Sequence, residues 1–270
     1  MVVQHNMSAL NANRQLGVTV GTLSKSTEKL SSGYRVNRAA DDAAGLSISE
    51  KMRSQIKGLN KASSNAQDGI SLVQTAEGAL NEAHSILQRM NELATQAAND
   101  TNTSVDRTAI QKEVDALGSE LNRIASTTQF NTMNLLDGSF IKKNLQVGSL
   151  EGQKIGLSIA TMSGDALSVT GLNVGSFGSA GSAMTKVQSA IDKISTQRSA
   201  LGAVQNRLEH TVKNLDNVSE NTQAAESRIR DTDMAAEMVQ YSATNIIQQA
   251  GQSMLSQANS QTQGVLSLLQ

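Results

Sequence analysis

The feature that most constrains this chain is a stripe of apolar residues between Met52 and Ala97. Its members recur in steps of three or four residues, the spacing that places side chains on one face of an α-helix. The whole sequence contains no proline, so nothing removes a backbone donor from this helix. Either Asp41 or Asp42 can cap its start. A continuous helix over residues 43–98 would be about 84 Å long at about 1.5 Å per residue, which suits a rod better than a globule.

Two further stripes predict helices that face the first one. A shorter stripe runs from Ile110 to Ile124, after the turn-rich segment NDTNTSVD at 99–106, and a long one runs from Val187 to Ile229. Nine of the 20 glycines lie between residues 138 and 181, where helix is therefore not expected. Alternating apolar residues predict a β-hairpin at about 140–160, followed by a short flexible connector at about 161–183. The fold class predicted is mainly α: an elongated, coiled-coil-like helical bundle with a small β-hairpin region and paired terminal helices.

The outer forty residues at each end carry narrower amphipathic stripes. Residues 1–40 have a formal charge of +4 and residues 231–270 a charge of −3. Either the two ends face each other or their counterparts on other copies, or these are solvated charges scattered by chance. Such marginal helices need packing partners, and we expect them to order on assembly; the alternative is that both dock on the same bundle. The residues predicted to mediate polymerisation are Leu16, Val20, Leu23, Leu30, Ile247, Met254, Val265 and Leu268.

Composition gives no support to an enzyme, a metalloprotein or a cofactor-binding protein. There is no cysteine, and the three histidines, His5, His84 and His210, lie in separate segments without a ligand at metal-binding spacing. The net charge of −1 does not indicate nucleic acid or an anionic membrane as a partner, and no apolar run approaches the length of a membrane span. The first residues, MVVQHNM, also lack the pattern of a secretory signal, so if the protein is exported, another route carries it.

Long segments of the sequence are similar to the bacterial flagellins. They include VQHNMSALNANRQL at 3–16, the block STEKLSSGYRVNRAADDAAGLSISEKMRSQI at 26–56, and the block at 67–100. TTQFNTMNLLDGSF at 127–140 and the C-terminal block at 227–269 complete the resemblance, which covers nearly the whole chain. With only about 25 residues between the hairpin and the last long helix, the resemblance is to a minimal flagellin without large outer domains.

The resemblance implies an extracellular subunit of the bacterial flagellar filament, used for motility. Residues 1–40 and 231–270 would form a discontinuous filament-core domain, and residues 41–230 a rod domain. The implied partners are other copies of the chain, a flagellar export chaperone and a filament cap protein, with export in an unfolded state and polymerisation at the tip. One alternative is a hook–filament junction protein, which shares related terminal segments. Another, from a different class, is a soluble coiled-coil signalling bundle.

The stretch QRMNELATQAAND at 88–100 resembles the flagellin segment that Toll-like receptor 5 binds. The resemblance implies receptor contacts for Arg89, Leu93 and Glu113, with Gln88 and Gln96 beside them. Arg89 and Leu93 are four residues apart and both avoid the stripe of the long helix, so we expect them to share an exposed face. The alternative is an ordinary solvated helix face.

Overall fold

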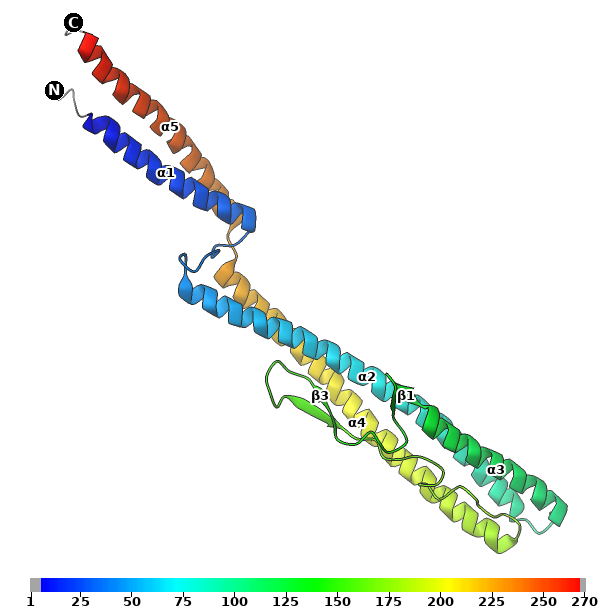
Figure 1. The fold of residues 1–270 in the computed structure, drawn as a ribbon. Coiled ribbons are helices and arrows are strands. Elements are labelled where there is room, and N and C mark those ends of the chain that lie inside the picture. The colour runs from blue at the N-terminus through cyan, green and yellow to red at the C-terminus, as the bar shows by residue number, and fades with distance from the viewer. Residues whose placement is uncertain (1–5, 268–270) are drawn as a thin grey trace. The chain divides into compact units, whose positions relative to one another are not determined.

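The computed structural model describes residues 6–267, apart from the side chains of residues 262, 263 and 265–267 (Figure 1). The fold is mainly helical, as predicted. Its described helices are α1 (Met7–Ser32), α2 (Ala43–Ala97), α3 (Ser104–Thr127), α4 (Phe177–Arg230) and α5 (Met234–Ser267). The strands are β1 (Gln129–Phe130), β2 (Met133–Asn134), β3 (Lys143–Gln146) and β4 (Lys154–Leu157). The chain divides into one unit of Met1–Ile56 and Glu220–Gln270 and a second unit of Lys57–Ser219.

The long unbroken helix is confirmed as α2, and its ends follow from local chemistry. Asp42 caps its start, since the Asp42 carboxylate accepts a hydrogen bond from the backbone N–H of Gly45 at 2.8 Å. After α2 ends, Thr103 and Asp106 form a reciprocal capping box that starts α3. The turn-rich segment between them therefore separates two helices without proline.

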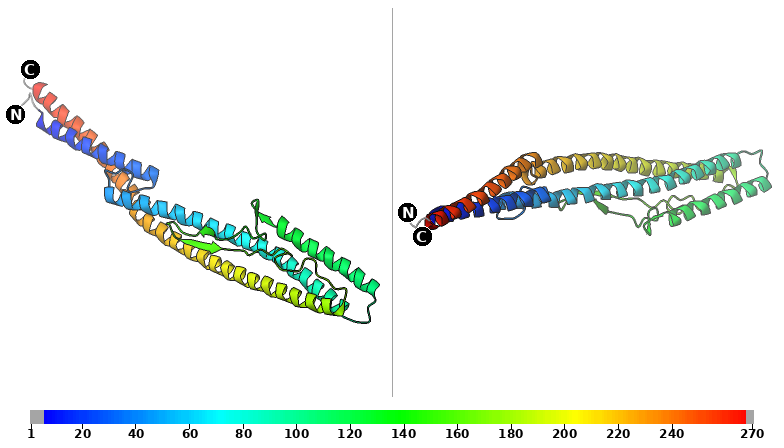
Figure 2. Two further views of the ribbon diagram at one scale, coloured as in Figure 1. Left: turned by 60° about the horizontal axis from the view of Figure 1, so that its bottom comes forward. Right: turned by 90° about the horizontal axis from the view of Figure 1, so that it is seen from above.

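The second unit has its core where α2, α3 and α4 lie along one another (Figure 2). The seam of α2 supplies buried alanines, leucines and a methionine, and α3 and α4 add their own stripes. Polar contacts between α2 and α4 reinforce the pairing: the Ser63 hydroxyl donates to Asp216 at 3.0 Å and the Ser219 hydroxyl to Asn60 at 2.8 Å. The largest side chains buried there are Leu80, Leu87, Met90, Leu93, Leu121, Leu135, Leu136, Leu157, Ile159, Ile194 and Leu201.

A β-hairpin is present within residues 140–160. β3 and β4 pair antiparallel, with Leu145 opposite Ile155. Ile155 and Leu157 are buried, which is the alternation that the sequence shows. Gly69 of α2 lets the hairpin approach closely, because a Cβ at this position would overlap the side chain of Leu145.

The segment 161–183 differs from the flexible connector that the sequence predicts. Most of its apolar side chains are buried although residues 161–176 form neither helix nor strand, and α4 already begins at Phe177. Gln111 of α3 fixes the segment, because its amide donates to the Leu172 carbonyl at 2.6 Å and accepts from the Val174 N–H at 2.8 Å. The buried residues are Met162, Leu167, Val169, Leu172, Val174, Ala180 and Ala183.

The first unit contains α1 and α5, which lie side by side (Figures 1 and 2). α1 ends at Gly33, whose φ of +74° gives the left-handed C-cap that glycine adopts without strain. Backbone hydrogen bonds then join the two connecting segments, from Thr232 N–H to the Gly33 carbonyl at 3.0 Å and from Arg35 N–H to the Arg230 carbonyl at 2.7 Å. Among the described residues, none of the helices has the length and hydropathy needed to span a membrane.

Candidate assembly surface and exposed ion pair

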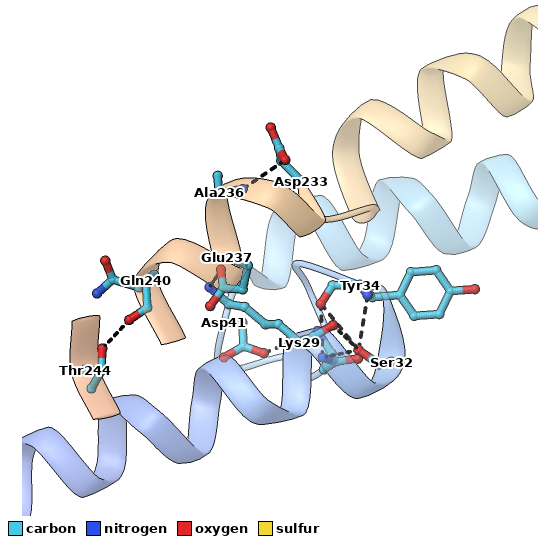
Figure 3. Close-up of polar contacts among 10 residues, drawn as sticks. Lys29, Ser32, Tyr34, Asp41, Asp233, Ala236, Glu237, Gln240 and Thr244 are labelled. Atoms are coloured by element: carbon cyan, nitrogen blue, oxygen red, sulfur yellow. Dashed lines mark hydrogen bonds and ion pairs between the residues drawn. The ribbon is translucent and has the colours of Figure 1, made fainter. Parts of the chain in front are cut away.

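The fully buried positions of the contact between α1 and α5 hold small polar side chains, and leucines of α1 are half-buried beside them. Thr19, Ser26 and Thr244 are the buried residues on these helices. The Thr19 hydroxyl donates to the Gln15 carbonyl at 2.9 Å, and the Thr244 hydroxyl donates to the Gln240 carbonyl at 2.6 Å (Figure 3). Each threonine thus satisfies its hydroxyl within its own helix.

Large apolar side chains of the same two helices face solvent instead. Leu10 and Val18 of α1 are 63% and 60% exposed, and Val239 and Ile246 of α5 are 72% and 67% exposed. Val239 and Ile246 are seven residues apart and therefore lie on one face of α5. Apolar residues grouped on an exposed helix face are typical of interaction surfaces. We call the exposed residues Leu10, Val18, Val239 and Ile246 the outer face.

The residues predicted to mediate polymerisation fall into two groups. Leu16, Leu23 and Leu30 are half-buried, whereas Val20, Ile247 and Met254 are exposed. Part of this set comes together, since a groove of about 210 Å³ between α1 and α5 is lined by Ala12, Gln15, Leu16, Thr19, Ile247, Gly251 and Met254. Val265 lies in α5 but its side chain is outside the described part of the chain, as is all of Leu268.

Tyr34 is the centre of a cluster beside the connecting segments of the first unit. Its ring makes cation–π contacts with two guanidinium groups, with Arg230 at 4.6 Å and Arg53 at 5.5 Å from the ring centroid. Arg53 also donates to the Tyr34 hydroxyl at 2.9 Å and forms an ion pair with Glu226 at 3.6 Å. Glu226 in turn accepts from the Ser49 hydroxyl at 3.1 Å. These contacts join the start of α2 to the end of α4.

Charged groups also meet near the end of α1 (Figure 3). Lys29 in the last turn of α1 forms an ion pair with Glu237 in the first turn of α5, at 3.6 Å. Each charge has the sign that its helix end favours. In the following loop, the backbone N–H of Arg38 donates to the Asp41 carboxylate at 3.0 Å and lowers the pKa of that carboxyl below its usual value.

The predicted receptor residues Arg89 and Glu113 are joined by an ion pair between α2 and α3. The Nη2 atom of Arg89 lies 2.9 Å from Oε1 of Glu113, and its Nη1 atom lies 3.1 Å from Glu92. Both Arg89 and Glu113 are exposed. The hydrogen bond to Glu113 is the main cause that raises the pKa of Arg89, with Glu92 second. The pair therefore presents fixed, opposite charges on one surface.

Leu93 does not share this surface, contrary to the expectation of an exposed face. Its side chain is only 2% exposed and belongs to the core of the second unit. The physical reason is that α2 contacts both α3 and α4, so two adjacent stripes of α2 are buried. The sequence analysis expected only one buried stripe. Gln88 and Gln96 are exposed, and the Gln88 amide lies 3.1 Å from Nε2 of His84.

Comparison with known proteins gives the family. The pattern of the bacterial flagellin N-terminal helical region matches residues 3–141, and that of the bacterial flagellin C-terminal helical region matches residues 184–269. This chain belongs to the bacterial flagellin family. A flagellin from Halalkalibacterium halodurans is 54% identical over 271 residues, which cover 100% of both chains. The chain is accordingly a subunit of the flagellar filament, an extracellular structural component without a catalytic role.

Solved structures agree with the fold. The crystal structure of Bacillus cereus flagellin is 34% identical, with a TM-score of 0.52, and the match covers 56% of this chain and 88% of that one. A putative flagellar hook-associated protein from Vibrio parahaemolyticus has a TM-score of 0.60 and covers 71% of this chain and 100% of its own. At 11% identity the second likeness shows the fold alone. The flagellin identification therefore rests on sequence.

The outer face is what the sequence analysis missed. On α1, Leu10 and Val18 stand away from the stripe chosen for polymerisation, whereas on α5 Val239 and Ile246 lie beside the chosen stripe. A signal was present in the sequence, because Val239 and Ile246 are β-branched residues one heptad apart.

Proposed function

We propose that this flagellin joins the filament through the outer face of α1 and α5, with residues 1–40 and 231–270 as the filament-core domain and residues 41–230 as the rod domain. The observation that carries this proposal is the inverted packing of the helix pair. Small hydroxyl residues occupy the buried positions, and large apolar residues are exposed. Burial of these residues against neighbouring copies would contribute about 25 cal/mol of favourable free energy per Å² of apolar surface, and the monomer alone lacks this contribution.

Charged substitutions on the outer face test the proposal. The double variant Val239→Asp/Ile246→Asp places two carboxylates on the surface that is to be buried, so seeded elongation of filaments should stop while helix content by circular dichroism stays unchanged. A matched control is Val105→Asp, because Val105 is 75% exposed at the start of α3, outside the terminal helices. Normal elongation by the double variant would contradict the proposed surface.

Export and tip assembly belong to the same proposal. The chain would cross the export channel unfolded, with an export chaperone on its C-terminal segment and a filament cap protein at the growing end. Two properties support this route. Without proline or cysteine, the chain has no slow prolyl isomerisation and no disulfide exchange during refolding outside the cell. The exposed apolar residues of α5 give a chaperone an apolar surface to cover. Isothermal titration of a cognate export chaperone with the full chain and with a 240–270 deletion measures this interaction, and equal binding would oppose it.

The monomer is also proposed to bind Toll-like receptor 5 through the surface around Arg89. The resemblance of residues 88–100 to the receptor-binding segment of flagellins supports this function, and so does the exposed ion pair of Arg89 with Glu113. Since Leu93 is buried, the contacts would come from Gln88, Arg89, Gln96 and Glu113. Arginine at such a position presents a planar donor group, a frequent hot spot of interfaces.

Binding of monomers to the receptor ectodomain, measured by surface plasmon resonance, tests this surface. Arg89→Ala should weaken binding about 30-fold, as expected of a hot-spot arginine worth about 2 kcal/mol. Arg123→Ala is the matched control, because Arg123 is also exposed and ion-paired, with Glu120 on α3. Equal binding by wild type, Arg89→Ala and Arg123→Ala would place the receptor site elsewhere.

A further inference from the structure

The groove of about 210 Å³ between α1 and α5 lies on one side of each helix. The helices run antiparallel, since the Asn6 amide at the start of α1 donates to the Ala258 carbonyl of α5 at 2.9 Å, and Lys29 at the end of α1 pairs with Glu237 at 3.6 Å. The lining residues of α1 are 12, 15, 16 and 19, and those of α5 are 247, 251 and 254. Steps of three and four residues place each set on a single helix face.

Small residues leave this groove open, and apolar side chains line it. Ala12 of α1 and Gly251 of α5 are the small residues, and Leu16, Ile247 and Met254 supply apolar walls. Leu16 packs toward Gly251, because a Cβ added there would lie 3.3 Å from Cδ1 of Leu16. An apolar cavity of about 150 Å³ can hold a benzene molecule, so the groove has room for an aliphatic side chain.

The opposite side of α1 carries two protruding apolar side chains. Leu10 is two residues from Ala12, and Val18 is two residues from Leu16. Two residues of an α-helix correspond to a rotation of about 200°, so each of the two side chains points away from a residue of the groove. Leu10 and Val18 are 63% and 60% exposed. The helix pair thus has a hollow on one side and apolar side chains on the other side of α1.

We infer that Leu10 and Val18 of one copy insert into the α1–α5 groove of a neighbouring copy. This inference rests on the proposed function of the outer face and names what the α1 part of that face contacts. A surface that binds its own counterpart closes a dimer, whereas two different complementary surfaces can repeat from copy to copy in an open helical array. A filament subunit needs the second arrangement, and the groove and the opposite side of α1 provide it.

Disulfides between single-cysteine chains test this contact, because the chain has no cysteine of its own. Met254→Cys places a thiol at the groove, and Leu10→Cys or Val18→Cys places one on the opposite side of α1. Two cysteines form a disulfide only when their Cα atoms come within about 7 Å. Filaments are grown from equal amounts of Met254→Cys and one of the two α1 variants, and are then oxidised.

We expect heterodimers in at least one of these two mixtures, at a level about tenfold or more above the homodimers of either chain. The matched control replaces the α1 variant by Val105→Cys, because Val105 is 75% exposed at the start of α3, outside the terminal helices. Its mixture with Met254→Cys measures disulfides that arise from chance collision.

Filling the groove from within is a second test, and it needs no cysteine. Ala12→Leu puts a large side chain into the groove, and leucine favours the helix nearly as well as alanine. Helix content by circular dichroism should therefore stay unchanged. Seeded elongation should slow about tenfold or more, because the incoming side chain would overpack the filled groove. Ala12→Ser leaves the groove open and should elongate within about twofold of the wild type.

Three results would overturn the inference. Homodimers as abundant as heterodimers would show that identical surfaces meet. Heterodimers no more abundant than in the Val105→Cys control, in both mixtures, would show that the groove does not receive this side of α1. Wild-type elongation by Ala12→Leu would show that the groove is not used in assembly.

Failure of the outer-face proposal gives a different pattern. Normal elongation by Val239→Asp/Ile246→Asp refutes that proposal directly, without reference to the groove. If this double variant stops elongation while Ala12→Leu elongates as the wild type does, the outer face stands and its partner is a surface other than the groove.

Discussion

Replacing Leu93 should destabilise the second unit, because Leu93 lies in the core of that unit and not on the proposed receptor surface. Its side chain is 2% exposed within a core that includes Met90, Ala94 and Val114. Leu93→Ala would leave a cavity that neighbouring alanines are too small to close. Truncation of a buried leucine costs about 2 to 5 kcal/mol, and we expect about 3 kcal/mol here. With a urea dependence of about 2 kcal/mol per M, the midpoint of unfolding should fall by about 1.5 M.

Two variants make this measurement decisive. Leu93→Met nearly conserves volume and should cost less than about 1.5 kcal/mol. Arg89→Ala removes an exposed side chain and should change the unfolding free energy by no more than about 0.5 kcal/mol. The assay is urea unfolding of monomers followed by circular dichroism. Equal midpoints for Leu93→Ala and Arg89→Ala would refute the burial of Leu93 and restore it as a candidate surface residue.

Three further predictions follow from contacts described above. Hydrogen bonds from Thr103 lower the pKa of Asp106. The stabilisation by the capping box is therefore fully present above the ordinary aspartate pKa, and it is lost as the pH falls through the lowered pKa of Asp106. The difference in melting temperature between wild type and Asp106→Asn should be present at pH 6 and vanish at low pH. A short peptide tag inserted at Gly152, in the hairpin turn, should leave the melting temperature unchanged, whereas the same tag at the buried Val169 should lower it. Tyr34→Leu removes both cation–π contacts and should speed amide exchange in the first turns of α2, and unchanged exchange would argue against a stabilising role.

Elements governed by local periodicity could be predicted from the sequence. The long helix expected at 43–98 is observed as Ala43–Ala97, because an uninterrupted stripe without proline allows no other regular structure over that length. The hairpin followed from alternation, which places Ile155 and Leu157 on the buried side. The Asp42 cap needed only the residue type and its position before the stripe.

Features that depend on contacts distant in sequence could not be predicted. Leu93 is buried because α2 is covered by two helices, which no single stripe reveals. Residues 162–174 lack a period because side chains of α3, such as Gln111, hold them in irregular backbone. The bond from Asn6 to Ala258 joins the two ends of the chain, and nothing local to either residue indicates the other.

The inverted packing of α1 and α5 makes their stability depend on protein concentration. Whatever binds only the folded form shifts the folding equilibrium by mass action, and for this pair that binding partner is another copy of the chain. The helix pair should therefore melt at low temperature in dilute monomer and at much higher temperature in the polymer. Depolymerisation and melting of the terminal helices then become one transition, whereas the core of α2, α3 and α4, closed within a single chain, melts independently of concentration.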